Sequence, residues 1–402
     1  MVTTVFPCEL HGVVSPPPSK SLAHRHLLCA ALANGSSTLS PVPEGADCLA
    51  TLSCLAGLGA TYQRQGERLL LRGGGAAPSS PRFFCGESGS TLRFAIPLSL
   101  ALSGGGCFTG FGRLLQRPLA PYEELFTSRG VLWRQKGSTL TISGRLTHGA
   151  YSLPGNISSQ FFSGLLLALP LVEGDSVLTA ATPPESADYI TMTLSVLAQY
   201  GIAITQQGQQ FFIPGGQRLR PQNVILEGDW SNAAFWAAAN AVGHSVTLDG
   251  MNPHSLQGDS RISDLLRLSP PEIDLGSCPD LAPPLAAWGC MRKGRLTLSN
   301  AGRLRFKECD RLSAIAEVLS AMGAKITVDD SALVIEGQSS LSGNCTVSCH
   351  NDHRIAMMAA IAATRCRHPV TLLGSECVAK SYPAFWQDFQ KLGGNIHEHT
   401  GA

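Results

Sequence analysis

The sequence predicts an α/β fold built from six copies of one unit of about 70 residues. Three observations lead to this prediction. A helical segment that ends in glycine, followed by a strand, a polar turn and a second strand, recurs along the chain. A second kind of helical segment, apolar on nearly all sides, alternates with the first. The chain has 402 residues, 44% of them hydrophobic and 15% charged, which is long and apolar enough for two domains.

The first kind of segment is recognised by the glycine that closes each helix, because glycine suits the left-handed position after a helix. The closing residues are Gly59, Gly130, Gly201, Gly323 and Gly393. A shortened copy without its glycine is expected to begin at residues 262–276. The last copy, FWQDFQKLGGNI, is expected to be cut short by the end of the chain.

The second kind of segment predicts where polar chemistry gathers. Its copies read SKSLAHRHLLCAALA, GSTLRFAIPLSLAL, SSQFFSGLLLALPL, DWSNAAFWAAANAV, PDLAPPLAAW and HNDHRIAMMAAIAA. A helix that is apolar on all sides is buried, so we expect these helices to be surrounded by sheet, with Ser, Asp or Asn capping their first turns. Because helix N-termini attract anions, ends that also carry Lys, Arg and Ser predict a multiply anionic ligand.

Cationic side chains outnumber carboxylates at these helix ends, although the chain as a whole has 30 Lys and Arg against 29 Asp and Glu. Arginine suits bidentate binding of phosphate and carboxylate groups. Asp280, Glu308 and His353 are the groups available for proton transfer. Each residue taken alone fits a structural role better than a functional one, as a helix cap, a surface charge or a buried histidine. The functional interpretation rests on the recurrence of charged ends.

Composition and motifs argue against several classes of function. A balanced net charge does not indicate binding to nucleic acid or to a membrane surface. The longest apolar stretches, such as residues 165–172, are far shorter than the ~20 residues of a membrane span, and no secretory signal is recognisable. Thirteen cysteines without a CxxC pair fit reduced thiols in the cytoplasm, and no metal site is indicated. The glycine-rich stretches lack the ending of a phosphate-binding P-loop.

Nine segments of the chain resemble the EPSP synthase (3-phosphoshikimate 1-carboxyvinyltransferase) family of enolpyruvyl transferases. They occur in the family's order and span nearly the whole chain. The combination of SKS with a following Arg, KExDR and NDHR is the specific part. The segments are PPPSKSLAHRHLLCAALA, GESGSTLR, RPLAPYEEL, SSQFFSGLLLALPL, EGDWSNAAF, CPDLAPPLAA, RFKECDRLSAIAEVLSAMGA, HNDHRIAMMAA and CVAKSYPAFW.

The resemblance implies a fold and a reaction. The fold is a two-domain inside-out α/β barrel of six βαβαββ repeats, three per domain. The first domain would be residues 14–227 and the second residues 1–13 with 228–402, with the active site in the cleft between them. The enzyme would transfer the enolpyruvyl group of phosphoenolpyruvate to the 5-hydroxyl of shikimate 3-phosphate and release phosphate. This step belongs to the shikimate pathway, which leads to chorismate and the aromatic amino acids. A cytoplasmic monomer without cofactor or metal is expected, and glyphosate is the family's competitive inhibitor.

The resemblance also assigns residues, motif by motif. Asp280 would be the base toward the 5-hydroxyl and Glu308 the proton donor to the methylene carbon, two roles that are partly exchangeable. Lys20 and His353 complete the expected catalytic set. Shikimate 3-phosphate would contact Lys20, Ser21, Arg25, Ser158, Ser159, Gln160, Ser186, Tyr189, Asp280 and Lys307. Phosphoenolpyruvate would contact Lys20, Gly89, Arg117, Gln160, Arg311, Arg354 and Lys380.

The chain departs from the family pattern at two places. The segment GESGS has Glu87 where the family usually has Asn, and a carboxylate beside a phosphoenolpyruvate site should repel that anion. We therefore expect Glu87 to weaken the binding of phosphoenolpyruvate and glyphosate. After Ser186, Ala187 and Asp188 replace a usual basic residue and proline, which bears on the edge of the shikimate-phosphate site.

Two alternative functions remain open from the sequence. One is the sister enzyme that transfers enolpyruvyl to UDP-N-acetylglucosamine, which usually carries a cysteine in a mobile loop. This chain has Gln116, Arg117 and Pro118 there and no nearby cysteine. The other is a catalytically impaired, anion-binding relative. Retention of Lys20, Asp280 and Glu308, with the arginines of KExDR and NDHR, argues against it.

Overall fold

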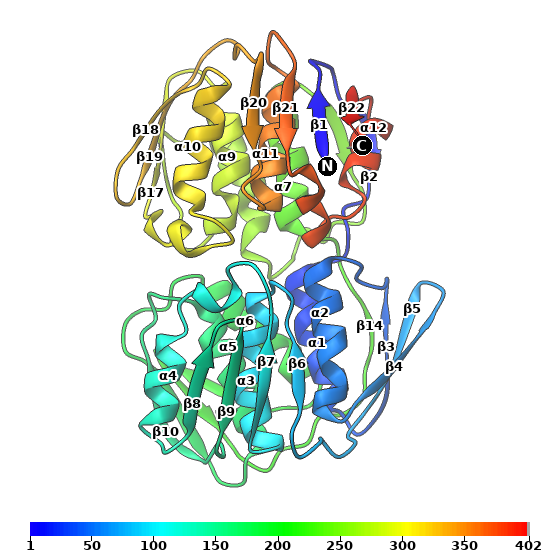
Figure 1. Cartoon of the computed structure of the whole chain (residues 1–402), viewed down its shortest axis with the longest axis vertical. Helices are drawn as coiled ribbons and strands as arrows, with labels where there is room; N and C mark the ends of the chain where they lie inside the picture. Colours follow the sequence, from blue (N-terminus) through cyan, green and yellow to red (C-terminus); the bar gives the residue numbers. More distant parts are fainter. Residues whose placement is uncertain (400–402) are drawn as a thin grey trace. The chain divides into compact units, whose positions relative to one another are not determined.

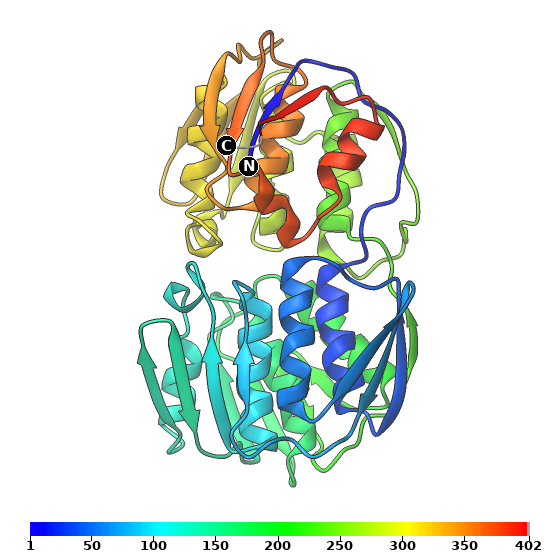
Figure 2. The same ribbon diagram turned by 45° about the vertical axis from the view of Figure 1, so that its right-hand side comes forward.

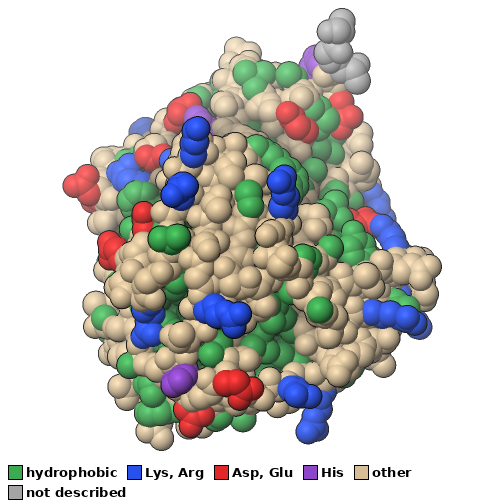
Figure 3. Space-filling model, turned by 60° about the horizontal axis from the view of Figure 1, so that its bottom comes forward, with side chains coloured by type: hydrophobic (Ala, Val, Ile, Leu, Met, Phe, Trp, Pro, Cys, Tyr) green, Lys and Arg blue, Asp and Glu red, His purple; other side chains and the backbone are tan. Residues whose placement is uncertain are grey.

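The computed structural model describes residues 1–399 and divides the chain into two compact units (Figure 1). Unit 1 comprises Met1–Pro17 and the chain from Glu227 onward, and unit 2 comprises Pro18–Leu226. No helix of the described chain is long and apolar enough to cross a membrane. On the face drawn in Figure 3, Lys and Arg side chains are scattered and interspersed with acidic ones.

Unit 2 contains three four-stranded sheets that share one topology. In each, the first two strands pair in parallel, and the second of them pairs antiparallel with a hairpin. In spatial order the sheets are β14 (Asn223–Ile225), β3 (Gly35–Ser40), β5 (Arg68–Gly73), β4 (Thr61–Gln65); β6 (Arg82–Phe84), β7 (Gly105–Thr109), β9 (Thr139–Ser143), β8 (Leu132–Lys136); and β10 (Gly149–Leu153), β11 (Ser176–Ala180), β13 (Gln210–Ile213), β12 (Thr205–Gln207).

Unit 1 repeats this topology in two sheets and keeps only the parallel pair in a third. In spatial order the sheets are β2 (His11–Val14), β15 (Ser245–Leu248); β16 (Glu272–Asp274), β17 (Arg295–Ser299), β19 (Leu333–Glu336), β18 (Lys325–Val328); and β20 (Cys345–Ser348), β21 (Val370–Leu373), β1 (Val2–Val5), β22 (Ile396–His399). The α/β fold of repeated units is thereby confirmed. The shortened copy that the sequence predicts at residues 262–276 has a helix there, Ile262–Leu268, and no hairpin follows it in the described chain, so its sheet keeps only two strands.

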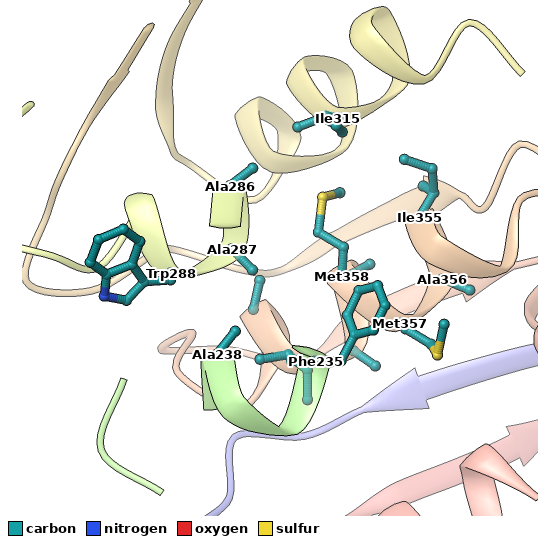
Figure 4. Close-up of a cluster of buried hydrophobic side chains, with 14 of the residues drawn as sticks. Phe235, Ala238, Ala286, Ala287, Trp288, Ile315, Ile355, Ala356, Met357 and Met358 are labelled. Atoms are coloured by element: carbon teal, nitrogen blue, oxygen red, sulfur yellow. The ribbon is translucent and has the colours of Figure 1, made fainter. Parts of the chain in front are cut away.

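Six helices with apolar surroundings form the inside of the two units. They are α1 (Lys20–Leu32), α3 (Gly89–Leu102), α5 (Ser159–Ala168), α7 (Trp230–Ala241), α9 (Ala282–Gly289) and α11 (His353–Ala363). Nearly every side chain of α11 is buried, as expected for a helix without a polar face. Figure 4 shows Phe235 of α7, Ala286 of α9 and Met358 of α11 gathered in the core of unit 1.

The other six helices are the ones that a left-handed residue follows, which is glycine in five of them. They are α2 (Ala46–Cys54), α4 (Ala120–Thr127), α6 (Ala187–Gln199), α8 (Ile262–Leu268), α10 (Arg311–Ala321) and α12 (Phe385–Lys391). The five expected glycines all have positive φ, from 79° at Gly130 to 102° at Gly323. In the shortened copy, Ser269 adopts the same left-handed conformation after α8, with φ 47°. Short 3-10 helices complete the chain at η1 (Leu55–Leu58), η2 (Leu114–Gln116), η3 (Leu169–Leu171), η4 (Gly258–Arg261), η5 (Pro279–Leu281), η6 (Gly302–Phe306) and η7 (Ser375–Lys380).

Within the described residues the last copy has one strand after its helix, β22, as the sequence predicts. Its missing strand is β1, from the other end of the chain, which lies between β21 and β22 and pairs antiparallel with both. Figures 1 and 2 show this blue strand beside the orange and red ones. Because β1 comes from the opposite end of the chain, the sequence around the last copy does not show which strand completes its sheet.

At each crossing between the units, the last strand before the crossing pairs within the unit that the chain is leaving. β2 precedes α1 of unit 2 in the chain, yet it pairs with β15 of unit 1. β14 precedes α7 of unit 1, yet it pairs with β3 of unit 2. Each unit therefore completes its first sheet with a strand that stands, in the sequence, before a helix of the other.

Side-chain caps begin five of the six inner helices, as the sequence predicts. Ser19, Ser88, Ser158, Asp229 and Asp352 each accept a hydrogen bond from a backbone N–H in the first turn of their helix. The exception is α9, which continues from η5 without a side-chain cap. These starts position the polar residues of the candidate site.

Candidate active site

In unit 1, one buried guanidinium joins three carboxylates. Arg311 is the first residue of α10 and is fully buried. It donates from Nη1 to Asp280 at 2.8 Å and from Nη2 to Glu308 at 2.6 Å. Its Nε donates to Asp352 at 2.9 Å. Burial alone would lower the pKa of Arg311, but the three carboxylates outweigh it and raise that pKa, so the side chain remains a cation.

Asp280 lies in η5 and faces two further cations. Its Oδ1 accepts from Lys307 Nζ at 3.2 Å and its Oδ2 from Arg354 Nη2 at 3.2 Å. Burial lowers the pKa of Lys307, while the charge of Asp280 acts in the opposite direction. The structure therefore brings five of the predicted site residues of unit 1 into one network, namely Asp280, Lys307, Glu308, Arg311 and Arg354.

The start of α11 holds the other predicted residues of unit 1. Asp352 caps this helix by accepting from the backbone N–H of Arg354 at 2.9 Å, and its other oxygen binds Arg311. His353 is buried, with Nδ1 3.9 Å from Asp352. Lys380, at the end of η7, donates to the carbonyl of Asn351 at 2.6 Å. Lys380 thus contacts the start of α11, the helix on which Arg354 lies.

A buried carboxyl that the sequence analysis did not single out lies near Asp280. Asp259 in η4 is only 1% exposed, and its Oδ2 accepts a hydrogen bond from Ser231 of α7. Its Oδ1 has no hydrogen-bond partner among the described residues. Burial raises the pKa of Asp259 to about 6, helped by the charges of Asp280 and Asp229 and opposed by Arg354 and the Ser231 hydrogen bond.

The raised pKa of Asp259 predicts a pH-dependent loss of stability. The folded chain holds the proton more tightly than the unfolded chain, so the free energy of unfolding falls as pH rises between about 4 and 6. A shift of this size corresponds to about 3 kcal/mol. Asp259→Asn has no carboxyl group to ionise at this position. Its stability relative to the wild type should therefore increase from pH 4 to pH 7. Urea unfolding of both proteins at each pH measures the difference, and parallel curves would contradict the prediction.

In unit 2, Lys20 and Arg25 lie on α1 in different surroundings. Lys20 forms an ion pair with Asp47 of α2 at 3.0 Å. Arg25 is buried and donates from Nη1 to the carbonyl of Ser21 at 2.7 Å. It also donates to Thr193, Ser163 and the carbonyl of Tyr189. Four of its five N–H groups are therefore taken within unit 2, which leaves one, at Nη1, for a substrate.

The start of α3 is covered by two arginines. A side chain at Gly89 would place its Cβ 2.7 Å from Nη1 of Arg93 and 2.8 Å from Nη1 of Arg117, so any larger residue would displace both guanidinium groups. Arg93 donates to Gln160 of α5 at 2.7 Å, and Gln160 donates to Ser90 at 2.9 Å. The structure therefore brings Gly89, Arg117 and Gln160 together, with Arg93 between them.

The serines predicted to hold a phosphate lie at the starts of α5 and α6. Ser158 caps α5, and Ser159 is the buried first residue of that helix. Ser186, before α6, has φ 55° and ψ 44°, a left-handed conformation that is costly for a residue other than glycine. Such strain is typical of a residue whose position matters for function.

Glu87 is half-buried just before the cap of α3. Its carboxylate lies against the backbone of Gly112, where an added Cβ would come within 1.7 Å of Oε1. Gly112 belongs to the loop that leads through η2 to Arg117. Glu87 thus contacts the segment that carries one of the predicted phosphoenolpyruvate ligands.

From this position we expect Glu87→Asn to lower the KM for phosphoenolpyruvate and the inhibitory constant for glyphosate, because it removes a negative charge beside an anion site. Steady-state kinetics of the variant and the wild type measure both constants. Glu44→Gln, which alters a carboxylate in an exposed ion pair with Arg64 of the same unit, is the control. An unchanged or higher KM for phosphoenolpyruvate would refute the expectation.

Sequence reasoning assigned no role to the partners that hold these residues in place. Asp47, Arg93, Asp259 and Asp352 all bind or surround predicted ligands. Asp47 and Asp259 stand in none of the quoted motifs, whereas Arg93 stands in GESGSTLR and Asp352 in NDHR without an assigned role. Arg93 and Asp352 could have been found as charged residues at inner-helix starts. The predicted residues also separate into two sets, one in each unit. Within residues 1–399, no group of three or more His, Cys, Asp or Glu side chains is placed to hold a metal ion.

Comparison with known proteins gives consistent matches along the whole chain. The family model described as EPSP synthase (3-phosphoshikimate 1-carboxyvinyltransferase) matches residues 6–389. Proteins named 3-phosphoshikimate 1-carboxyvinyltransferase from Clostridium botulinum (strain Eklund 17B / Type B) and Clostridioides difficile (strain 630) are 40% and 39% identical, with 98% of each chain covered.

Solved structures of similar fold include EPSP synthase from Acinetobacter baumannii. That structure has a TM-score of 0.81 and 26% identity, covering 98% of this chain and 99% of the other. The enolpyruvyl transferase NikO from Streptomyces tendae has a TM-score of 0.77 at 18% identity, covering 100% of this chain and 99% of the other, which is a likeness of fold alone.

Proposed function

The chain belongs to the EPSP synthase family, and from that premise we propose how its own residues divide the work of the family's reaction. The enzyme transfers the enolpyruvyl group of phosphoenolpyruvate to shikimate 3-phosphate, in the shikimate pathway of aromatic amino-acid biosynthesis. In our proposal the residue set of unit 1 and that of unit 2 act on the same pair of substrates.

Glu308 and Asp280 perform the proton transfers. Glu308 gives a proton to the methylene carbon of phosphoenolpyruvate, which makes C2 electrophilic. The 5-hydroxyl oxygen of shikimate 3-phosphate then bonds to C2, and Asp280 accepts the hydroxyl proton. The Glu308 carboxylate then takes a proton back from the new methyl group while the C2–O bond to phosphate breaks, which restores the double bond and releases phosphate. General acid–base catalysis of this kind contributes about 10²–10⁴-fold to a rate.

The observation that carries this assignment is the bridge through Arg311. Asp280 and Glu308 bind the two terminal nitrogens of the same guanidinium, at 2.8 and 2.6 Å. Two carboxylates held by one rigid group are oriented together, which an acid and a base on the same reacting unit require. The shared partner also supports the partial exchangeability of their roles.

The cations stabilise the anionic substrates and the leaving phosphate. In the proposal phosphoenolpyruvate is surrounded by Lys20, Gly89, Arg117, Gln160, Arg311, Arg354 and Lys380. Shikimate 3-phosphate is held by Lys20, Ser21, Arg25, Ser158, Ser159, Gln160, Ser186, Tyr189, Asp280 and Lys307. Fixed positive charge near a departing phosphate stabilises the transition state without further reorganisation. His353, buried beside Asp352, is the last member of the proposed catalytic set.

The test is phosphate release by the purified protein with phosphoenolpyruvate and shikimate 3-phosphate, each omitted in turn. Release that requires both substrates is the expected result. UDP-N-acetylglucosamine in place of shikimate 3-phosphate tests the sister reaction. Release with that acceptor alone, or no release with either, would overturn the proposal.

We also propose that the enzyme is a cytoplasmic monomer. Both sets of site residues come from one chain, so catalysis needs no second copy. All thirteen cysteines are free, which fits a reducing compartment. Light scattering of the purified protein during gel filtration measures its mass, and a mass of two or more chains would contradict the monomer.

A further inference from the structure

Buried polar side chains connect α1, α2 and α3 inside unit 2, where the surroundings are otherwise apolar. His24 Nδ1 lies 2.7 Å from the hydroxyl of Thr51, and that hydroxyl lies 2.7 Å from the hydroxyl of Thr91. Thr91 in turn donates to Ser88 Oγ at 2.8 Å. All four residues are at most 2% exposed. Such groups are costly to bury unless they bind one another, so this arrangement is specified by the fold.

The four residues connect with the Lys20–Asp47 ion pair. Thr91 contacts the backbone carbonyl of Asp47 at 3.5 Å in addition to Ser88. His24 follows Lys20 by one turn on α1, and Thr51 follows Asp47 by one turn on α2. The Lys20–Asp47 ion pair and the His24–Thr51 hydrogen bond therefore link α1 and α2 at two positions one turn apart. We call the set His24, Thr51, Thr91 and Ser88 the buried relay.

The relay has a defined hydrogen-bond direction. Burial lowers the pKa of His24 to about 3, so the ring is neutral at physiological pH and carries one N–H. Its Nε2 has no partner among the described residues, and an orphaned acceptor is more common in proteins than an orphaned N–H. The hydrogen is therefore on Nδ1 and donates to Thr51. Thr51 then donates to Thr91 and Thr91 to Ser88, whose oxygen also accepts the Thr91 backbone N–H at 3.2 Å and so caps α3.

We infer that the buried relay is a positioning network for phosphoenolpyruvate, which holds Lys20 and the start of α3 at Gly89 at a fixed separation within unit 2. The inference rests on the proposed function, in which Lys20 and Gly89 bind that substrate. None of the four relay residues is in the predicted ligand set. What they share is that they link α1, which carries the predicted ligand Lys20, to α3, which carries the predicted ligand Gly89.

The relay should act on one substrate more than on the other. Lys20 serves both substrates, but the helix start at Gly89 serves phosphoenolpyruvate, and the Arg25 contacts to Ser163 and Thr193 are separate from the relay. Loosening the relay therefore raises the KM for phosphoenolpyruvate and leaves that for shikimate 3-phosphate nearly unchanged. A general loss of packing would affect both.

The experiment replaces Thr51 by Val, which keeps the shape and removes both hydrogen bonds. Without these two hydrogen bonds the helices that carry Lys20 and Gly89 are no longer held at a fixed separation, so we expect the KM for phosphoenolpyruvate to rise about tenfold. The KM for shikimate 3-phosphate should stay within about twofold, and Thr51→Ser, which retains a hydroxyl, should restore the wild-type value. Thr91→Val breaks the next link and should give the same selective change.

Ser99→Ala is the matched control. Ser99 is fully buried on the same helix as Thr91, but its hydroxyl bonds only the carbonyl of Ile96 at 2.8 Å. Its kinetics should equal those of the wild type. The inference is overturned if Thr51→Val and Thr91→Val leave the KM for phosphoenolpyruvate unchanged, raise both KM values equally, or fail to fold while Thr51→Ser is no better than Thr51→Val. Absence of activity in the wild type would instead refute the proposed function.

Discussion

Glu308→Gln is expected to lower kcat by about 10²–10⁴-fold, because an amide cannot give the proton that activates phosphoenolpyruvate. The amide keeps the size of the side chain and still offers an oxygen to Arg311, which Glu308 binds at 2.6 Å. The KM values should therefore change little. In D2O the wild type should incorporate deuterium into the vinyl group of the product, and the variant should do so only at its reduced turnover rate.

Asp280→Asn is expected to lower kcat over the same range but with a different effect on binding. Asp280 pairs with Lys307, Arg311 and Arg354, so the variant leaves three cations with one carboxylate fewer. Since phosphoenolpyruvate is an anion and Asp280 is not among its proposed ligands, the KM for phosphoenolpyruvate should stay the same or fall. Asp264→Asn, which alters an exposed carboxylate of unit 1 paired with Arg267, should behave as the wild type. A kcat within tenfold of the wild type in either Glu308→Gln or Asp280→Asn would remove that residue from the proposed acid–base pair.

Arg311→Met is expected to destabilise unit 1 by about 3–5 kcal/mol and to abolish activity. The guanidinium is fully buried between Asp280, Glu308 and Asp352, so its removal leaves three carboxylates without their common counter-ion. Arg311→Lys keeps the charge but offers one point of attachment in place of a fork, so it should recover only part of the stability.

Urea unfolding followed by tryptophan fluorescence measures this effect, because Trp230, Trp236, Trp288 and Trp386 lie in unit 1 and only Trp133 in unit 2. Arg267→Met is the control, since Arg267 forms an exposed ion pair with Asp264 and its loss should cost less than about 1 kcal/mol. Equal unfolding midpoints for Arg311→Met and Arg267→Met would show that the buried network does not stabilise unit 1.

Local sequence determined the helices, their ends and the repeated plan of this protein. The chain has a positive φ at Gly59, Gly130 and the other closing positions. Glycine stands there because residues with a Cβ avoid that conformation. Ser19, Ser88 and Asp352 cap their helices because a short polar side chain reaches the free N–H groups of the first turn. Both effects act within a few residues, so a sequence pattern contains them. The resemblance to a family added the roles of individual residues.

Only the tertiary structure decided which distant segments meet. The pairings of β1 with β21 and β22, of β2 with β15 and of β14 with β3 join strands far apart in the sequence, and no local pattern marks them. The same holds for the site. The sequence identified Arg311, but its simultaneous contact with Asp280, Glu308 and Asp352 arises because η5, α10 and α11 converge in the core of unit 1. Ion pairs and buried hydrogen bonds join residues by distance in space, and that distance is set by how the sheets and helices pack.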